Sequence, residues 1–219
     1  MKIPVAIYRD WINSRKVPSD RKQLANEALN TFEILSARKT IEPFDLEPII
    51  QAAKSPYLVA FDIGTEMLVR LAVNNLTAQS VIREIVLGAR KENERFRMIA
   101  ALNNDLPREF TIELLRKALY DKGKRVREKA AAMADTLELK ELLPEIDKCL
   151  HSESHPITKK GIELHAAMLR DGYLLKKIED GNYSLTVRIN NGWRVQIVKK
   201  AEIENGKLYQ IIADARSQP

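Results

Sequence analysis

Three histidines have the side-chain type best suited to catalysis or metal binding. His151, His155 and His165 are close together in the sequence, and Glu153 or Glu163 would supply a carboxylate beside them. Histidine and carboxylate side chains are common zinc ligands. However, His151 and His155 flank an expected loop, and no spacing fixes these side chains around one ion. We therefore expect solvent-facing loop histidines and no metal site.

The other reactive side chains are isolated. Cys149 is the only cysteine, which excludes an internal disulfide and a cysteine-based zinc cluster. It lies beside an apolar helix position, where a small buried thiol is ordinary, and a nucleophile would need a paired base that the sequence does not imply. Asp62, Asp121 and Asp135 are expected to cap helices or to form ion pairs. Because the chain also lacks a glycine-rich phosphate loop, we expect neither an enzyme nor a cofactor.

Basic side chains form the most concentrated charged group. Only Asp121 and Glu128 oppose the seven cations between Arg116 and Lys129, which are Arg116, Lys117, Lys122, Lys124, Arg125, Arg127 and Lys129. The whole chain has 36 Lys and Arg against 30 Asp and Glu, a net charge of +6. Such a surplus permits binding to nucleic acid or to an acidic protein surface.

The segments that carry these residues repeat along the chain. Four anchors, Ala53, Ala89, Leu119 and Leu150, are separated by 36, 30 and 31 residues. Apolar residues recur seven and four positions before each anchor, which traces one face of a helix. A second helix face follows after a short polar connection. Its columns contain Ala60, Phe96, Val126 and Ile157 at plus seven, Gly64, Ala100, Ala130 and Gly161 at plus eleven, and Met67, Asn103, Met133 and Leu164 at plus fourteen.

The third repeat resembles a known family. Leu119-Tyr120-Asp121, followed by Arg125-Val126-Arg127-Glu128-Lys129-Ala130-Ala131-Ala132, is similar to the HEAT repeat in its short bacterial and archaeal form. The resemblance covers residues 43–171, and Tyr57-Leu58-Val59 departs from it because the family usually has a charged turn there. It implies a mainly α fold, a right-handed α-solenoid in which neighbouring helical pairs bury each other's apolar faces. The alternative is four amphipathic hairpins in an ordinary helical bundle.

In a solenoid, equivalent positions of successive repeats fall in a row. We therefore expect a basic stripe that could follow a phosphate backbone. Its candidate binding residues are Arg95, Arg97, Arg125, Arg127, Lys129, Lys159 and Lys160. The competing interpretation is structural, because an arginine beside the second helix of a HEAT-like repeat often pairs with an acid of the adjacent repeat. Asp121 and Glu94 are available for such a pair.

Residues 1–42 are expected to form an N-terminal helical pair, a degenerate repeat that covers the end of the solenoid. Leu24, Ala28, Phe32 and Leu35 form the apolar stripe of its second helix, and Ser19-Asp20 is expected to cap that helix. The Met1-Lys2-Ile3-Pro4 start lacks the long apolar stretch of a secretory signal.

Residues 172–219 are expected to form a small antiparallel β-meander. Apolar residues alternate on both sides of Asn190-Asn191-Gly192, which indicates a hairpin. Matching apolar partners favours a three-residue loop that sets Ile189 opposite Trp193, Val187 opposite Val195 and Leu185 opposite Ile197. We expect flanking strands near 173–178 and 207–213. The apolar face of this sheet should pack on the last helical repeat.

Three functions fit these features. The first is a non-catalytic scaffold that presents a concave HEAT-like surface to a protein partner. The alternative is nucleic-acid binding through the basic stripe. The third is a HEAT-like alkylpurine DNA glycosylase, whose cleft holds an aromatic cluster with an acid; here Trp11 and Trp193 both lie outside the repeats. No run of apolar residues is long enough to cross a bilayer, so we expect no membrane partner. The single cysteine, which forms no internal disulfide, favours a reducing, cytoplasmic location.

Overall fold

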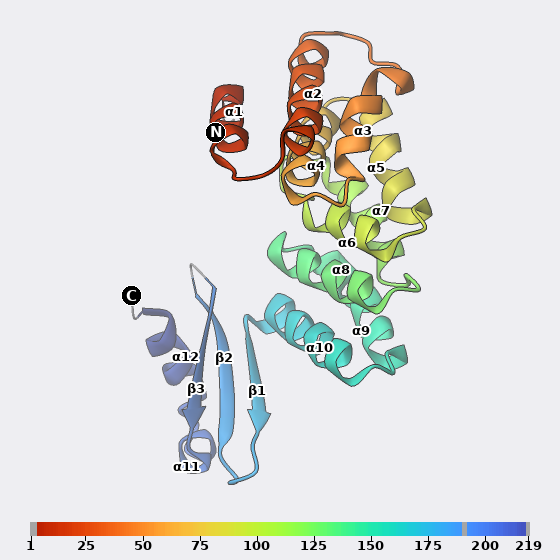
Figure 1. Ribbon diagram of the computed structural model, residues 1–219. Coiled ribbons are helices and arrows are strands. Elements are labelled where there is room, and N and C mark those ends of the chain that lie inside the picture. Colours follow the sequence, from red (N-terminus) through yellow and green to blue (C-terminus); the bar gives the residue numbers. More distant parts are fainter. Residues whose placement is uncertain (1–3, 190–191, 218–219) are drawn as a thin grey trace. The chain divides into compact units, whose positions relative to one another are not determined.

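The computed structural model describes residues 4–189 and 192–217. The chain is mainly helical, with one small antiparallel sheet near the C-terminus (Figure 1). It divides into two compact units, Met1–Met133 and Ala134–Pro219. The expectations for Met1-Lys2-Ile3 and for Asn190-Asn191 lie outside the described residues, and the domain boundaries after residues 42 and 171 stay predictions.

The first unit contains only helical elements among its described residues. These are α1 (Val5–Ser14), α2 (Ser19–Ser36), the 3-10 turn η1 (Pro43–Leu46), α3 (Glu47–Ala53), α4 (Leu58–Ala72), α5 (Leu76–Gly88), α6 (Glu92–Ala100) and α7 (Arg108–Ala118). Helix α8 (Lys124–Thr136) begins in the first unit and ends in the second.

The second unit combines helices with the sheet. Its elements are η2 (Lys140–Leu142), α9 (Leu143–Ser152), α10 (Pro156–Asp171), β1 (Tyr173–Lys177), β2 (Tyr183–Ile189), β3 (Gly192–Val198), α11 (Lys200–Glu204) and α12 (Leu208–Ser217). Within the described residues, no helix has the length and apolar composition needed to cross a bilayer.

The helical pairs expected around the four anchors are confirmed as α3–α4, α5–α6, α7–α8 and α9–α10. In the first unit, α4 packs against α2, α3 and α5, and α5 packs against α6 and α7. The second-helix columns of the first and third pairs are buried, namely Ala60, Gly64, Met67, Val126, Ala130 and Met133. At Gly64 the small residue is required, because a Cβ atom there would lie 2.2 Å from the backbone nitrogen of Ala53.

The expected columns are wrong in the second and fourth pairs. In α6, Ile99 is buried while Ala100 is exposed, and in α10, Thr158 is buried while Ile157 is 72% exposed. The reason is the connection between the helices. Residues 89–91 form a shorter turn than residues 54–57, which moves the buried face of α6 one position earlier. Helix α9 continues beyond Leu150, which moves the buried face of α10 one position later.

The N-terminal pair is confirmed as α1 and α2, and Ala28, Phe32 and Leu35 of the expected stripe are buried. The expected cap is wrong. Ser19 is the first helical residue, Pro18 occupies the N-cap position, and no side chain bonds to the N-terminal backbone groups there.

The C-terminal sheet has the strand order β1-β2-β3, with both pairs antiparallel. The predicted hairpin register is wrong, because Ile189 lies opposite Gly192, Val187 opposite Arg194 and Leu185 opposite Gln196. Apolar matching across β2 and β3 therefore did not set the register. The apolar face of β2 is buried by another element instead.

That element is α12, which occupies the segment where a fourth strand near 207–213 was expected. Leu208, Ile211, Ile212 and Ala215 recur at helical spacing, and they pack with Leu185, Val187 and Val198 of the sheet. The apolar face of the sheet thus packs on α12 and not on the last helical pair. The face opposite α12 reaches α10 through an ion pair between Lys176 and Glu163.

An ion-paired carboxylate links two consecutive pairs in the first unit. Glu113 on α7 accepts hydrogen bonds from Arg83 on α5, at 2.9 Å and 3.3 Å, and from Lys117 at 3.0 Å. These hydrogen bonds, first that of Arg83 and then that of Lys117, lower the pKa of Glu113 to about 2.

We predict that Gly64→Ala destabilises the first unit by at least about 1–3 kcal/mol, the usual range for overpacking. The added methyl group meets the backbone of Ala53, which cannot rotate away. Gly88→Ala is the matched control, because nothing lies within 4 Å of its Cβ position at the end of α5. Urea unfolding followed by circular dichroism measures both. Equal stability of the two variants would contradict the close approach of α3 and α4.

We predict that Glu113→Gln lowers the melting temperature at pH 7 and that this loss disappears as the pH falls toward 2. A carboxylate with a depressed pKa stabilises the fold above its unfolded-state pKa, and the stabilisation is lost as the pH falls through the folded-state value. Glu84→Gln on α5 is the control, since this exposed carboxylate has no ion pair within the described part of the chain. A loss that is independent of pH would rule out the ion pair as its cause.

Candidate functional site

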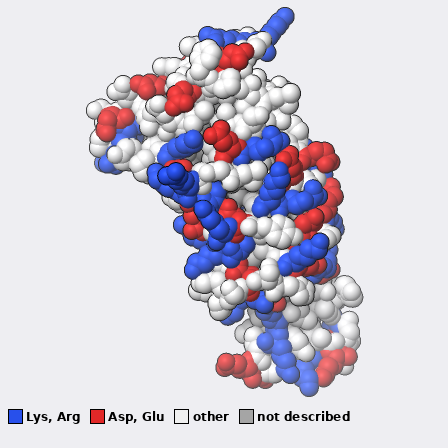
Figure 2. Space-filling view, turned by 90° about the vertical axis from the view of Figure 1, so that its right-hand side faces the viewer, with Lys and Arg blue, Asp and Glu red and all other residues white. Residues whose placement is uncertain are grey.

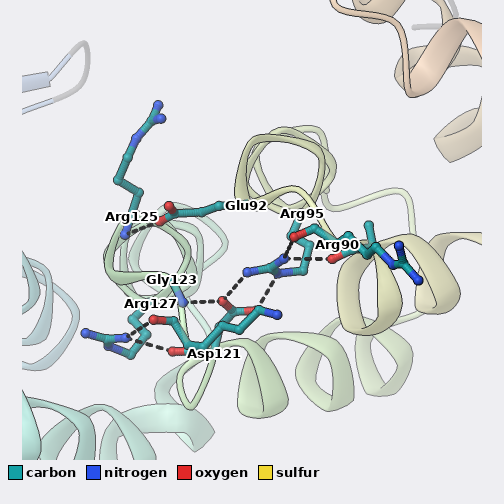
Figure 3. Close-up of polar contacts among 9 residues, drawn as sticks. Arg90, Glu92, Arg95, Asp121, Gly123, Arg125 and Arg127 are labelled. Carbon is teal, nitrogen blue, oxygen red and sulfur yellow. Dashed lines mark hydrogen bonds and ion pairs between the residues drawn. The ribbon is translucent and has the colours of Figure 1, made fainter.

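Arg95, the first member of the expected basic stripe, is buried and does not lie on the surface. Its side chain is 2% exposed, and it donates hydrogen bonds to Asp121 at 2.7 Å and 2.8 Å. The third nitrogen donates to the backbone carbonyls of Ala89 and Arg90, at 2.7 Å and 3.2 Å (Figure 3). Hydrogen bonding to Asp121 raises the pKa of Arg95. The structural interpretation of this arginine is therefore confirmed.

Arg95 is buried because the buried face of α6 lies one position earlier than the repeat pattern predicts. The one-position shift brings an arginine to a buried position, where a guanidinium must be ion-paired and hydrogen-bonded. Asp121 meets this need, and its carboxylate also accepts from the backbone N–H of Gly123 at 2.6 Å. One acid thus joins the α5–α6 turn to the α7–α8 turn.

Arg127 and Arg125 face different surroundings on α8. Arg127 donates to the carbonyls of Asp121 and Lys122, at 2.7 Å and 3.2 Å, and so holds its own turn. The side chain of Arg125 extends away from this cluster (Figure 3) and is exposed. The Arg125 guanidinium lies 4.6 Å from the ring centre of Phe96. Lys129 approaches the same ring at 5.3 Å, and both distances are typical of cation–π contacts.

Arg97 makes a similar contact one helical pair earlier. Its guanidinium lies 4.4 Å from the ring centre of Phe61, and it donates to the carbonyl of Ser55 at 3.2 Å. Lys159 and Lys160 belong to the second unit, where they are exposed near the start of α10. On the face shown in Figure 2, basic side chains are interspersed with acidic ones. The first unit therefore offers Arg97, Arg125 and Lys129 as ring-supported cations and not an unbroken stripe.

A groove lies between α1 and the first half of α4 in the first unit. Two adjoining cavities, of about 350 and 410 Å³, share Trp11 and Asp62 in their linings. The first cavity is otherwise lined by Ile7, Tyr8, Ile63 and Glu66, and the second contains Arg15, Lys16, Arg21, Tyr57 and Leu58. We call this surface the α1–α4 groove.

Apolar side chains are exposed along the α1–α4 groove. Leu58 is 63% exposed, Ile7 is 54% exposed and Tyr57 is 38% exposed. Exposed apolar residues that gather around a cavity mark interaction sites more often than singly scattered ones. The sequence carried one signal for this surface, the departure of Tyr57-Leu58-Val59 from the charged turn of HEAT-like repeats. No sequence signal indicated that α1 forms one wall of the groove, because only the fold brings α1 beside α4.

The two ends of the groove differ in charge, with cations at one end and with Glu66 and Arg70 beside Tyr8 at the other. At one end, Arg15 lies 4.4 Å from the ring centre of Trp11, and Arg21 lies 4.1 Å from that of Tyr57. At the other end, the Tyr8 hydroxyl donates to Glu66 at 2.9 Å.

Burial changes the protonation of two groups in the groove. It is the main cause that raises the pKa of Tyr8 to about 12, with a further contribution from Glu66, so this hydroxyl stays protonated. Between the two ends, burial raises the pKa of Asp62, while Arg97 and Arg15 oppose the shift.

Each of the three histidines has a contact within the second unit. His151 contacts the carbonyl of Asp147, and His155 caps α10 by accepting from the backbone N–H of Thr158 at 3.4 Å. His165 differs from the expected loop histidine, because it is half-buried on α10, 3.0 Å from Asp135 and against Trp193. Cys149 is buried, as expected. The described residues contain no group of three metal-ligating side chains.

Comparison with known proteins adds no assignment. No protein-family model matches the chain, and neither the curated proteins nor the solved structures gave a match. The α1–α4 groove and the ring-supported cations are the surfaces of the first unit from which a function can be inferred.

We predict that Arg95→Ala destabilises the first unit by about 3–5 kcal/mol, because it leaves Asp121 without its buried partner. Arg90→Ala is the control, since that neighbouring side chain is exposed and should change stability by less than about 0.5 kcal/mol. Urea unfolding measures both variants. Similar losses of stability in the two variants would show that the Arg95–Asp121 ion pair makes no specific contribution to stability.

Proposed function

We propose that this chain is a non-catalytic binding protein, a scaffold that docks a segment of another protein in the α1–α4 groove. In this proposal residues 43–171 form a right-handed HEAT-like solenoid, and α1 completes the groove at its N-terminal end. The observation that carries the proposal is the pair of adjoining cavities around Trp11 and Asp62, bordered by exposed Leu58, Ile7 and Tyr57.

The lining of the groove supports a particular kind of partner. Binding energy at protein interfaces concentrates in a few apolar or aromatic anchors that fill pockets. The centre of the groove, between Ile7 and Leu58, suits one such anchor. The cations Arg15, Lys16 and Arg21 at one end suit acidic side chains next to that anchor. The partner segment is therefore apolar at its centre and acidic at one end.

Nucleic-acid binding is the second candidate, and the ring-supported cations favour it. Arg97, Arg125 and Lys129 are held over aromatic rings, so less side-chain entropy is lost when they contact a phosphate. The loss of Arg95 to the interior and the interspersed acids weaken this candidate. The DNA glycosylase alternative is supported by Trp11 and Asp62, an aromatic residue and an acid that line the same groove. Trp11 lies outside the repeats.

We predict that a tagged chain captures a protein from the source cell and that Leu58→Asp reduces this capture at least tenfold. The aspartate places a charge where the partner's apolar anchor should lie. Leu76→Asp is the matched control, because Leu76 is also the first residue of a helix, α5, and is 78% exposed. Quantitative mass spectrometry after nuclease treatment measures the capture, and circular dichroism checks that both variants are folded.

Two results would overturn the protein-binding proposal. Equal capture by both variants would exclude the α1–α4 groove as the binding site. Capture abolished by nuclease would support nucleic-acid binding instead, and Arg125→Ala with Lys129→Ala should then weaken that binding and reduce its salt dependence. Release of a methylated base from DNA, lost in Asp62→Asn, would favour the glycosylase.

A further inference from the structure

The edge strand β3 has an unusual exposed face. The sheet order β1-β2-β3 leaves β3 with a neighbour on one side only. Leu185 and Val187 of β2 face α12, so their partners Gln196 and Arg194 share that inner face. The intervening Trp193, Val195 and Ile197 therefore point to the other face. They are 45%, 66% and 69% exposed.

The backbone groups of the same three residues point outward along the free edge. The N–H of Arg188 bonds to the carbonyl of Gly172, so the even-numbered residues of β2 bond toward β1 and the odd-numbered residues toward β3. The partners of those odd-numbered residues are Gln196 and Arg194, whose backbone groups point back to β2. The N–H and C=O groups of Val195 and Ile197 consequently face away from the sheet, and none has a partner within residues 4–189 and 192–217.

Natural edge strands are usually protected against pairing with other chains. Protection comes from lysines or proline on the edge, from bulges, from charged side chains turned to the inner face, or from a covering element. Between Gly192 and Val198 there is no lysine or proline. The one protecting charge, Arg194, is turned to the inner face, where it donates to the carbonyl of Ala215 at 2.7 Å, and the outer face of the strand carries no charge. At the start of the strand Trp193 is partly covered by His165, with ring centres 5.3 Å apart. Val195 and Ile197 remain open.

We propose that β3 pairs with an extended acidic segment of a partner protein, which adds a fourth strand to the sheet. Main-chain hydrogen bonds supply affinity in this mode, and alternating side chains supply specificity. Residues 192–200 contain Arg194, Lys199 and Lys200 and no carboxylate, and Lys200 is ion-paired with Glu204 of α11. An extended segment with alternating apolar and acidic residues complements both the apolar face and this charge.

The charge and the size of the edge argue against a second copy of the chain as the occupant. A second copy would bring the same three cations to the interface. A strand of this length is roughly 23 Å long at about 3.3 Å per residue. With strands about 4.8 Å apart, such a pairing covers roughly 110 Å², far less than the roughly 800 Å² per partner of a stable interface. The proposed site lies in the second unit, so it does not depend on the α1–α4 groove.

Peptide binding tests the proposal directly. The probe is a fluorescein-labelled, end-capped peptide of alternating glutamate and valine, and binding to the full chain is followed by fluorescence anisotropy. The matching lysine–valine peptide should bind at least tenfold more weakly. Val195→Pro should weaken binding of the glutamate–valine peptide about tenfold, because it removes an outward N–H without touching the ladder to β2. Val195→Thr keeps the N–H and should bind like the wild type.

Other variants separate this site from the groove. Leu58→Asp should leave peptide binding unchanged, because Leu58 lies in the α1–α4 groove. Failure of the β3 proposal can therefore be distinguished from failure of the groove proposal. Equal binding of the two peptides, or unchanged binding by a folded Val195→Pro variant, would overturn the proposal. A wild-type dimer in sedimentation velocity that Val195→Pro abolishes would also overturn it, because it would assign the edge to a second copy.

Discussion

The buried ion pair between Arg95 and Asp121 is the interaction on which the arrangement of α5 to α8 depends. A guanidinium in the interior requires a partner for its charge and acceptors for its hydrogens, and one carboxylate with two backbone carbonyls provides them. The same carboxylate also binds the backbone of Gly123. Two consecutive inter-helix turns are therefore held in one relative position, which sets how α6 and α8 present their outer side chains.

This constraint determines which cations of the first unit remain for function. Arg95 and Arg127 hold the turns. Arg97, Arg125 and Lys129 lie over Phe61 and Phe96, where the rings restrict their motion without neutralising their charge. A basic segment in the sequence is thus divided between structural and exposed roles. Of the basic segment between Arg116 and Lys129, Arg116, Lys117, Lys122, Lys124 and Arg125 are exposed.

In the second unit, apolar residues are likewise divided between buried and exposed positions. Helix α12 packs against Leu185 and Val187 of β2, so these residues need no apolar partners opposite them on β3. The apolar residues of β3 are consequently left on the other face, where Val195 and Ile197 are exposed. Leaving such residues on an unpaired edge exposes the strand to pairing with other chains, which makes a recognition role the simplest explanation for their placement.

The sequence by itself determined the helical pairs, because apolar residues at helical spacing must be buried on one side of each helix. It also indicated β1, β2 and β3. For the arginines it left two interpretations open, a basic stripe or a pair with an acid of the adjacent repeat, for which Asp121 and Glu94 were available. Only the tertiary structure decided the buried faces of α6 and α10, since turn length shifts a helix face by one position without changing the pattern. It also decided the register of β3, because α12 replaced the expected cross-strand partners, and the α1–α4 groove, because its two walls are far apart in the chain.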